Sequence, residues 1–331
     1  MTWALPKQVQ NGKYTLESVL GEGRFGITYL AKNQKGDRIV IKTLKNRSHP
    51  DFDRLQQKFV QEAFKLAKCQ HPHIVRVLED PFQEDGLWCI ALEYIAGVNL
   101  AHRDRNILPE SEALNYIQQI GEALKVVHAN NFVHRDVKPA NIMMRAGSQQ
   151  VVLIDFGLAR GFDSKKLSIT NVEDEAEPGF TPPELYSHTV ELGAYTDIYS
   201  LAATLYNLLT GQIPISARER VENNAPLPVP RDLNPQISHN VNNQIMKAMD
   251  LDIKNRPQSI QEWFDALDLK PIIQPETPKK PFNYDKYGLW IGILGLIIAL
   301  IAIFTGIFAN DIREFFIKPS PQITPTNNSK N

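Results

Sequence analysis

The sequence of 331 residues predicts an α+β fold, with a β-rich N-terminal part, a mainly helical C-terminal part and one apolar helix near the C-terminus. Residues 27–44 alternate in polarity like two paired strands, ITYLA and RIVIKTL, around a KNQKGD turn. Residues 111–130 repeat apolar side chains at helical spacing, and residues 196–211 are typical of a buried helix that Gly211 stops. The globular body is expected to cover residues 14–269.

Charge and cysteine content narrow the class of protein. The chain carries 36 basic and 37 acidic side chains, a formal net charge of −1, so no global electrostatic attraction to nucleic acid is expected. Apolar residues make up 43% and charged residues 22%, an ordinary globular balance. Cys69 and Cys89 lie in apolar stretches, which favours two buried thiols in a reducing compartment over a disulfide framework or a zinc site.

Residues 288–309 contain no ionisable side chain across 22 positions. A helix of this length reaches about 33 Å, enough to cross a hydrocarbon core of about 30 Å. The alternative is a buried core helix, but such helices are shorter and are interrupted by polar residues. The pattern therefore predicts one transmembrane helix.

The segments on either side of the apolar run suggest its orientation. Residues 270–287 form a proline-rich juxtamembrane linker, and residues 310–331 form a short polar tail. Basic residues are in excess before the run, at Lys279, Lys280 and Lys286, so the N-terminal side is expected to be cytoplasmic. We expect a single-pass protein of the cell membrane with a cytoplasmic globular body.

A glycine-rich loop precedes the predicted hairpin. Gly21, Gly23 and Gly26 have the G-x-G-x-x-G spacing, which also occurs in Rossmann sites and in ordinary turns. Here a strand follows rather than a helix, and a glycine-rich hairpin can bring backbone N–H groups close to phosphates. An ordinary flexible hairpin is the alternative, and the loop alone does not decide between them.

Two charged residues interrupt apolar patterns further along the chain. Lys42 lies inside the strand IVIK, and Glu62 points to the buried face of a helix predicted over residues 51–69. That face carries the apolar residues Leu55, Phe59, Ala63 and Leu66. A buried acid is costly without a partner, so Lys42 and Glu62 are expected to pair and to hold the lysine within reach of phosphate oxygens.

Charges of both signs concentrate in HRDVKPAN, residues 134–141, and an acid ends the apolar strand of VVLIDFG, residues 151–157. Asn141 and Asp155 are oxygen donors of the kind that bind Mg²⁺. Asp136 could accept a proton from a hydroxyl, and a lysine two residues later could neutralise a phosphoryl group in transfer. A solvated turn is the alternative for this segment.

The ordered motifs GEGRFG, IVIK, Glu62, HRDVKPAN, DFG and PPE resemble those of the eukaryotic-type (Hanks-type) serine/threonine protein kinases, in a bacterial membrane-anchored form. The resemblance covers roughly residues 14–269. It implies the bilobal protein-kinase fold, with a small β-rich lobe and a large helical lobe. It also implies transfer of the ATP γ-phosphate to Ser or Thr hydroxyls of proteins, with autophosphorylation and a signalling role.

The resemblance also assigns roles to individual residues. Asp136 would be the catalytic base and Lys138 would contact the γ-phosphate. Asn141 and Asp155 would bind Mg²⁺ or Mn²⁺, and Lys42, oriented by Glu62, would hold the α- and β-phosphates. The other implied ATP contacts lie in the glycine-rich loop and in the hinge ALEYI: Leu20, Gly21, Glu22, Gly23, Arg24, Phe25, Gly26, Ile27, Thr28, Glu93 and Ile95.

The resemblance implies structural roles as well. Leu92 would be the gate beside the hinge, and His134 would pack rather than catalyse. Asp197 would anchor the catalytic loop, and Arg256 would pair with Glu184.

One departure from the family pattern leaves an alternative open. Ala176 and Glu177 stand where the family has Gly-Thr, and that threonine ordinarily hydrogen-bonds the catalytic groups. A pseudokinase, acting as a regulatory binding module at the membrane, is therefore the alternative function. It predicts loss of a catalytic or metal residue, yet all of these are present. A kinase of lipids or small molecules is disfavoured by the PPE motif. Thr170 is the first candidate for an activating phosphorylation.

Overall fold

The computed structural model describes residues 3–23, 26–45, 52–156, 179–187 and 190–270. The chain divides into two compact units, Met1–Pro275 and Glu276–Asn331, and the second lies outside the described residues together with the predicted transmembrane helix. None of the helices within the described ranges combines the length and hydrophobicity that a membrane crossing requires.

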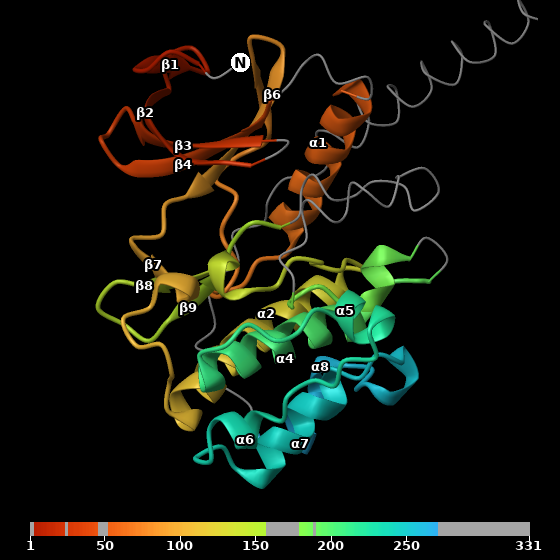
Figure 1. Cartoon of the computed structure of the whole chain (residues 1–331). Coiled ribbons are helices and arrows are strands. Elements are labelled where there is room, and N and C mark those ends of the chain that lie inside the picture. Colours follow the sequence, from red (N-terminus) through yellow and green to blue (C-terminus); the bar gives the residue numbers. More distant parts are fainter. Residues whose placement is uncertain (1–2, 24–25, 46–51, 157–178, 188–189, 271–331) are drawn as a thin grey trace, which may run out of the picture. The chain divides into compact units, whose positions relative to one another are not determined.

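The small lobe is a six-stranded sheet in the order β1-β2-β3-β4-β6-β5 (Figure 1). The predicted hairpin is confirmed: β3 and β4 are antiparallel, and Thr28 pairs with Lys42. The sheet begins before residue 14, because β1 adds an edge strand to β2. The strands are β1 (Lys7–Val9), β2 (Tyr14–Glu22), β3 (Gly26–Asn33), β4 (Arg38–Leu44), β5 (Phe82–Glu84) and β6 (Leu87–Glu93).

Helix α1 (Phe52–Lys68) contacts β6 and confirms the predicted amphipathic face. Its four predicted apolar residues are buried, and Glu62 is buried among them with 6% of its surface exposed. The side chains of α1 belong to a core that continues into the large lobe, whereas the opposite face of the sheet has a separate small core. The two thiols, Cys69 and Cys89, are buried and free, as predicted.

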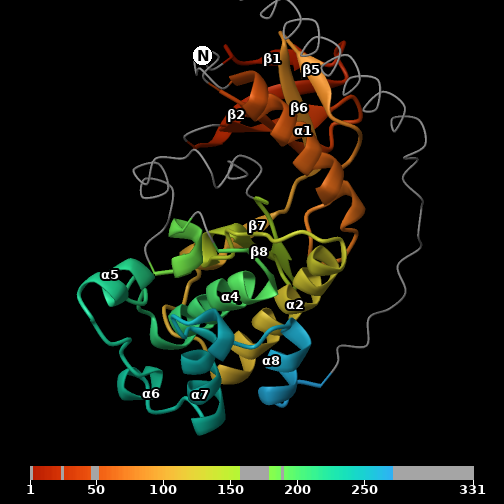
Figure 2. The same cartoon turned by 90° about the vertical axis from the view of Figure 1, so that its right-hand side faces the viewer.

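The large lobe is built around α4 (Ala194–Thr210), whose side chains are buried almost all round because α2, α6 and α7 pack against it (Figure 2). Gly211 ends this helix with φ 71°, as predicted. The other helices are α2 (Glu110–Ala129), α5 (Ala217–Glu222), α6 (Pro230–Leu233), α7 (His239–Ala248) and α8 (Ile260–Ala266). Short 3-10 helices span Leu100–His102, Pro139–Asn141, Pro183–Tyr186 and Ile253–Asn255.

A second, three-stranded sheet lies between the small lobe and the helices of the large lobe (Figure 1). Its order is β7-β8-β9, formed by β7 (Gly97–Asn99), β8 (Ile142–Arg145) and β9 (Val151–Leu153). The strand β7 follows the hinge directly, and β8 follows the predicted catalytic loop directly. This sheet therefore joins the two segments on which the predicted site depends.

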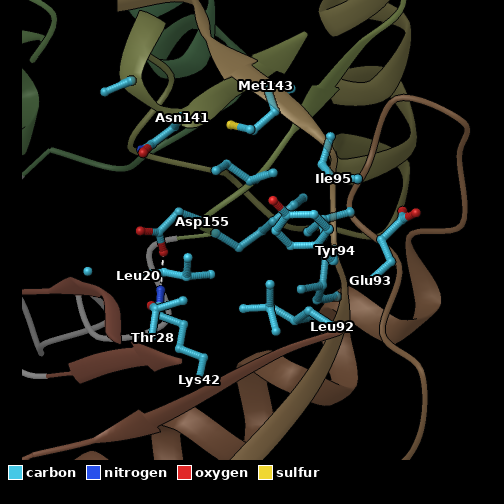
Figure 3. Close-up of a pocket in the computed structure, with 18 residues that line it drawn as sticks. Leu20, Thr28, Lys42, Leu92, Glu93, Tyr94, Ile95, Asn141, Met143 and Asp155 are labelled. Carbon is cyan, nitrogen blue, oxygen red and sulfur yellow. Dashed lines mark hydrogen bonds and ion pairs between the residues drawn. The ribbon is translucent and has the colours of Figure 1, made fainter. Parts of the chain in front are cut away.

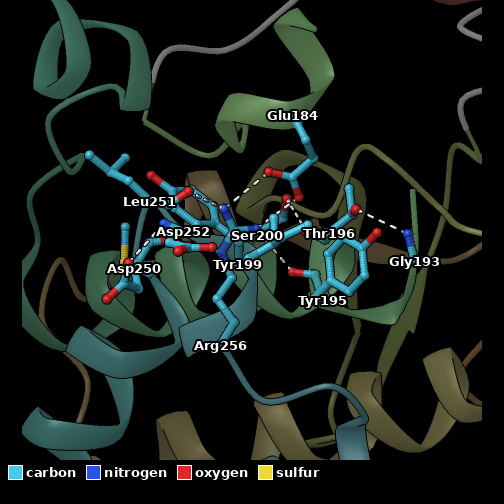
Figure 4. A network of polar contacts seen from close by, with 12 residues as sticks. Glu184, Gly193, Tyr195, Thr196, Tyr199, Ser200, Asp250, Leu251, Asp252 and Arg256 are labelled. Atoms are coloured by element: carbon cyan, nitrogen blue, oxygen red, sulfur yellow. Dashed lines mark hydrogen bonds and ion pairs between the residues drawn. The ribbon is translucent and has the colours of Figure 1, made fainter. Parts of the chain in front are cut away.

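A buried ion pair fastens the PPE motif to the large lobe, as predicted (Figure 4). The two terminal nitrogens of Arg256 donate to the two carboxylate oxygens of Glu184 at 2.8 and 3.0 Å. Arg256 Nε donates to the carbonyl of Asp250 at 2.7 Å, and the guanidinium lies 4.9 Å from the centre of the Tyr199 ring. Both charges are almost fully buried, so each depends on the other.

Replacing Arg256 is therefore expected to be strongly destabilising. Arg256→Ala leaves the Glu184 carboxylate buried without its partner, which costs about 3–5 kcal/mol of unfolding free energy. Arg105→Ala is the matched control, since it removes an exposed pair with Glu112 and costs under about 1 kcal/mol. Urea unfolding of both variants measures the difference, and equal losses would contradict the prediction.

Candidate active site

A cavity of about 490 Å³ lies between the strands of the small lobe, the hinge and β8 (Figure 3). This volume is in the range of ordinary small-molecule sites. The structure places many of the predicted nucleotide contacts on its walls: Leu20, Gly21, Thr28, Lys42, Glu93, Ile95, Asn141 and Asp155. Leu92 also lines it, beside the hinge as predicted.

The alternation of β4 explains why a lysine reaches this cavity. Val40 and Lys42 line the cavity, whereas Ile39 and Ile41 are buried in the small core on the other face of the sheet. The same alternation corrects one predicted contact: Ile27 does not line the cavity, because its side chain is buried in the small core. Period-two alternation thus separates the cavity face from the core face.

The glycine-rich loop is partly outside the described residues, which leaves Arg24 and Phe25 without a position. Glu22 does not line the cavity, because its carboxylate is 2.7 Å from Lys45 Nζ in an ion pair. The exposed Glu22 carboxyl has a lowered pKa, caused first by this hydrogen bond. Gly23 and Gly26 close the loop with an N–H···O bond of 2.9 Å and do not line the cavity either.

The expected Lys42–Glu62 pair is not formed, which corrects the sequence prediction. Among the described residues, Lys42 Nζ pairs with the Asp155 carboxylate (Figure 3), while Glu62 Oε2 is buried without a hydrogen-bond partner. Burial raises the pKa of Glu62 to about 7, opposed by nearby cations of which Arg135 is the strongest. Partial protonation of Glu62 near neutral pH weakens its attraction for Lys42, which pairs with Asp155 instead.

The catalytic loop brings the predicted polar groups together. Asn141 Nδ2 donates to the backbone carbonyl and to Oδ2 of Asp136, both at 2.8 Å. Lys138 Nζ lies 3.5 Å from the other carboxylate oxygen, Asp136 Oδ1. The side-chain nitrogen of Asn141 is directed at Asp136. The side-chain oxygen of Asn141, Oδ1, is therefore available to bind a cation.

Asp197 anchors this loop from α4, as predicted. Its carboxylate is fully buried and accepts the backbone N–H groups of His134 at 2.9 Å and Arg135 at 2.8 Å. His128 Nε2, at the end of α2, lies 2.8 Å from the same carboxylate. Burial alone would raise the pKa of Asp197, but His128 and the backbone donors bring it below its ordinary value. The anchor is therefore an ionised carboxylate.

The ring of His134 packs instead of facing the cavity, which confirms its predicted structural role. It lies edge-on to Phe156 with ring centres 4.5 Å apart, and Phe132 stacks on Phe156 at 6.2 Å. Asp155, directly before Phe156, has φ 55°. The aromatic packing therefore holds the strand end that carries Asp155 against the catalytic loop.

Comparison with known proteins assigns this arrangement to a family. A model of the protein kinase domain matches residues 14–265, more than half of the chain. The chain belongs to the protein kinase family. The solved structure of the PpkA-294 apo form has a TM-score of 0.67 and 29% identity, and the match covers 80% of this chain and 99% of that one.

Two curated bacterial relatives of this kinase-family chain are serine/threonine kinases by name. A probable serine/threonine-protein kinase of Clostridium perfringens is 29% identical over 270 residues, which are 79% of this chain and 38% of the relative. The serine/threonine-protein kinase PrkC of Bacillus subtilis is 30% identical over 260 residues, which are 76% of this chain and 39% of PrkC. The match thus spans well under half of each relative.

The donor set of this kinase-fold site suits a hard divalent cation. The Asn141 carbonyl and the Asp155 carboxylate are oxygen ligands on neighbouring segments, and both side chains extend to the same side of the cavity (Figure 3). No group of three or more His, Cys, Asp or Glu that could enclose a metal occurs in the described ranges. Mg²⁺, which binds through few protein oxygens plus substrate phosphates, fits such a site.

Several apolar residues of the cavity were not predicted from the sequence. Met143 lies on β8, two residues after Asn141, but a 3-10 helix ends at Asn141, so strand alternation could not relate the two positions. Leu66 shares the buried face of α1 with Glu62, but Val75 follows no local pattern. The unpredicted lining is completed by Tyr94, Gly97, Ala140, Ile154 and Phe156.

The buried Glu62 is expected to make stability depend on pH. Its pKa is about 7 in the folded chain and 4.5 as a free side chain, so the folded state binds more protons between these values. The stabilising contribution is complete below pH 4.5 and is lost as the pH rises through 7. Glu62→Gln stays neutral and should be more stable than the wild type at pH 8, by up to about 3 kcal/mol.

Urea unfolding at pH 5 and pH 8 measures this effect. The two proteins should differ little at pH 5, and the difference should grow as the pH rises. Glu191→Gln, at an exposed position, is the control that should leave the pH dependence unchanged. An identical pH dependence in the wild type and Glu62→Gln would contradict the prediction.

Proposed function

We propose that this protein is an ATP-dependent serine/threonine protein kinase. The observation that carries the proposal is the hydrogen-bonded pair Asp136–Asn141 next to a cavity whose wall holds Lys42 and Asp155. These are the residue types that phosphoryl transfer requires, and they come from both lobes. The named serine/threonine kinases among the relatives support Ser or Thr as the acceptor.

In the proposed reaction, the hydroxyl oxygen of the protein substrate attacks the γ-phosphorus of ATP. The bond from that phosphorus to the β–γ bridging oxygen breaks, and ADP leaves. Asp136 accepts the hydroxyl proton, and the hydrogen bond from Asn141 Nδ2 to its Oδ2 fixes the direction of the carboxylate. Lys138, close to Asp136, neutralises charge on the transferred group.

Nucleotide binding changes the partner of Lys42. The α- and β-phosphates would take the place of Asp155 at the lysine ammonium, and Asp155 and Asn141 would hold the cation. Bound Mg²⁺ or Mn²⁺ supplies positive charge that neutralises the β- and γ-phosphates. Once Asp155 no longer competes for the lysine, the positive charge of Lys42 favours the ionised form of Glu62, and the two side chains can pair. The apolar wall of the cavity would hold adenine, and the backbone groups of Glu93 and Ile95 would bind it.

The residues present argue against the alternative of a pseudokinase. Lys42, Asp136, Asn141 and Asp155 are all retained, and the cavity is lined as a nucleotide site requires. The departure at Glu177 lies outside the described residues, as does Thr170.

We also propose that the chain is anchored in the cell membrane by one helix over residues 288–309, with the kinase domain in the cytoplasm. The proposal rests on the uncharged run of 22 positions and on the lysines that precede it. It agrees with the need of the proposed reaction for ATP, which is a cytoplasmic metabolite. Protein substrates would then be cytoplasmic or membrane-associated.

Removing the proposed base should abolish phosphorylation. Asp136→Asn keeps the shape of the side chain but cannot accept the hydroxyl proton, so transfer should fall at least about 100-fold. ATP affinity should stay close to that of the wild type. Radiolabelled transfer to a generic protein substrate and calorimetric ATP binding measure the two quantities. Asp104→Asn, an exposed position outside the cavity, is the control. Transfer by Asp136→Asn at the wild-type rate would overturn the assignment.

Membrane anchoring is tested by truncation. A chain that ends at residue 280 should appear in the soluble fraction of cells and keep its kinase activity, whereas the full chain should sediment with membranes. Ile298→Lys places a charge near the centre of the run, which costs about 3 kcal/mol on insertion and should lower the membrane-bound fraction. A full chain that is soluble without detergent would contradict the anchor.

A further inference from the structure

The side chain of Glu93, a hinge residue, also links segments outside the hinge. Figure 3 shows this carboxylate pointing away from the cavity that the hinge lines. Its Oε1 accepts the backbone N–H of Arg76 at 2.9 Å, and its Oε2 accepts from the Arg145 guanidinium at 3.1 Å. One carboxylate thus joins a segment of the small lobe, the hinge and β8.

Backbone contacts hold the same three segments close together. The N–H of Glu93 donates to the carbonyl of Arg76 at 2.9 Å, and the N–H of Ala146 donates to the carbonyl of Ala96 at 2.8 Å. Gly97 has φ 153°, and a Cβ atom there would lie 1.8 Å from the carbonyl oxygen of Met144. The chain after the hinge therefore lies directly against β8, the strand that carries Arg145.

A second arginine, Arg38 of the small lobe, contacts Tyr94, the hinge residue after Glu93. The Arg38 guanidinium lies 5.8 Å from the centre of the Tyr94 ring, and Arg38 begins β4. Consecutive hinge residues are thus held by one cation from the small lobe and one from β8. Arg145 stands four residues after Asn141, so its strand begins directly after the proposed cation ligand.

We propose that Arg145 is a positioning residue for the nucleotide. Its ion pair with Glu93 fixes the hinge against β8, so that the backbone groups of Glu93 and Ile95 stay where adenine needs them. This inference rests on the proposed function, since it concerns the same nucleotide site. Arg145 does not line the cavity, so it acts through the hinge and not by contact with the ligand.

The expected loss of ligand affinity depends on how far the Arg145–Glu93 pair is exposed to solvent. The side chains of Arg145 and Glu93 keep 30% and 19% of their surface exposed, so solvent screens the pair. Losing a pair of this kind weakens ligand binding by about two- to fivefold, without unfolding the protein. The loss should affect adenine recognition and leave the phosphoryl-transfer step unchanged.

The test compares full-length wild type with Arg145→Ala, Arg145→Lys and the control Arg105→Ala, which removes an exposed arginine–carboxylate pair elsewhere. Calorimetry measures the Kd of ATP and of adenosine, a ligand without phosphates. Arg145→Ala should weaken both by the same factor of about two to five, with kcat at saturating ATP unchanged. Arg145→Lys keeps a cation for this single contact and should bind both ligands nearly as the wild type does.

Three results would overturn the inference. The first is wild-type adenosine affinity in Arg145→Ala. The second is a parallel fall of kcat, affinity and unfolding midpoint, which would indicate a general structural role. The third is a wild type that binds neither ligand. Because adenosine binding requires no phosphoryl transfer, a protein that binds adenosine but phosphorylates nothing would refute the proposed activity while still testing Arg145.

Discussion

The buried carboxylate of Asp197 is the interaction on which the geometry of the catalytic loop depends. An ionised acid with no exposed surface is tolerated only when its oxygens are satisfied, and here they accept two backbone N–H groups of the loop and a histidine. The requirement works in both directions. The loop supplies the donors that Asp197 needs, and Asp197 fixes the backbone directly before Asp136, where Arg135 has φ 69°.

Glu62 is also a buried acid, but its environment differs from that of Asp197. It has no comparable set of donors, burial raises its pKa to about 7, and its expected partner Lys42 is paired elsewhere. The free energy difference between a neutral and an ionised Glu62 is therefore small near neutral pH. Small changes in the surrounding charge are enough to alter its state, whereas Asp197 remains ionised.

Much of the fold was predictable because its signals are local. The hairpin at Lys42, the amphipathic face of α1 and the glycine that ends α4 follow from periodicity and turn chemistry over a few residues. The partner of Lys42 was not predictable in this way, because Asp155 is 113 positions away and because the raised pKa of the buried Glu62 has no local sequence signal. Neither the His128–Asp197 contact nor the Glu93–Arg145 pair has a sequence signal, since each joins distant segments.

These contrasts divide the site into a fixed part and an adjustable part. Asp136 and Asn141 are hydrogen-bonded to each other and lie on a loop that Asp197 holds from the buried helix α4. Lys42, Asp155 and Glu62 instead form a set in which one cation has two acids nearby and pairs with Asp155. Entry of an anionic ligand at Lys42 changes this balance and can redistribute charge among the three without moving the base. The groups that must be placed accurately for proton transfer are thus separated from those whose pairing must change when the ligand binds.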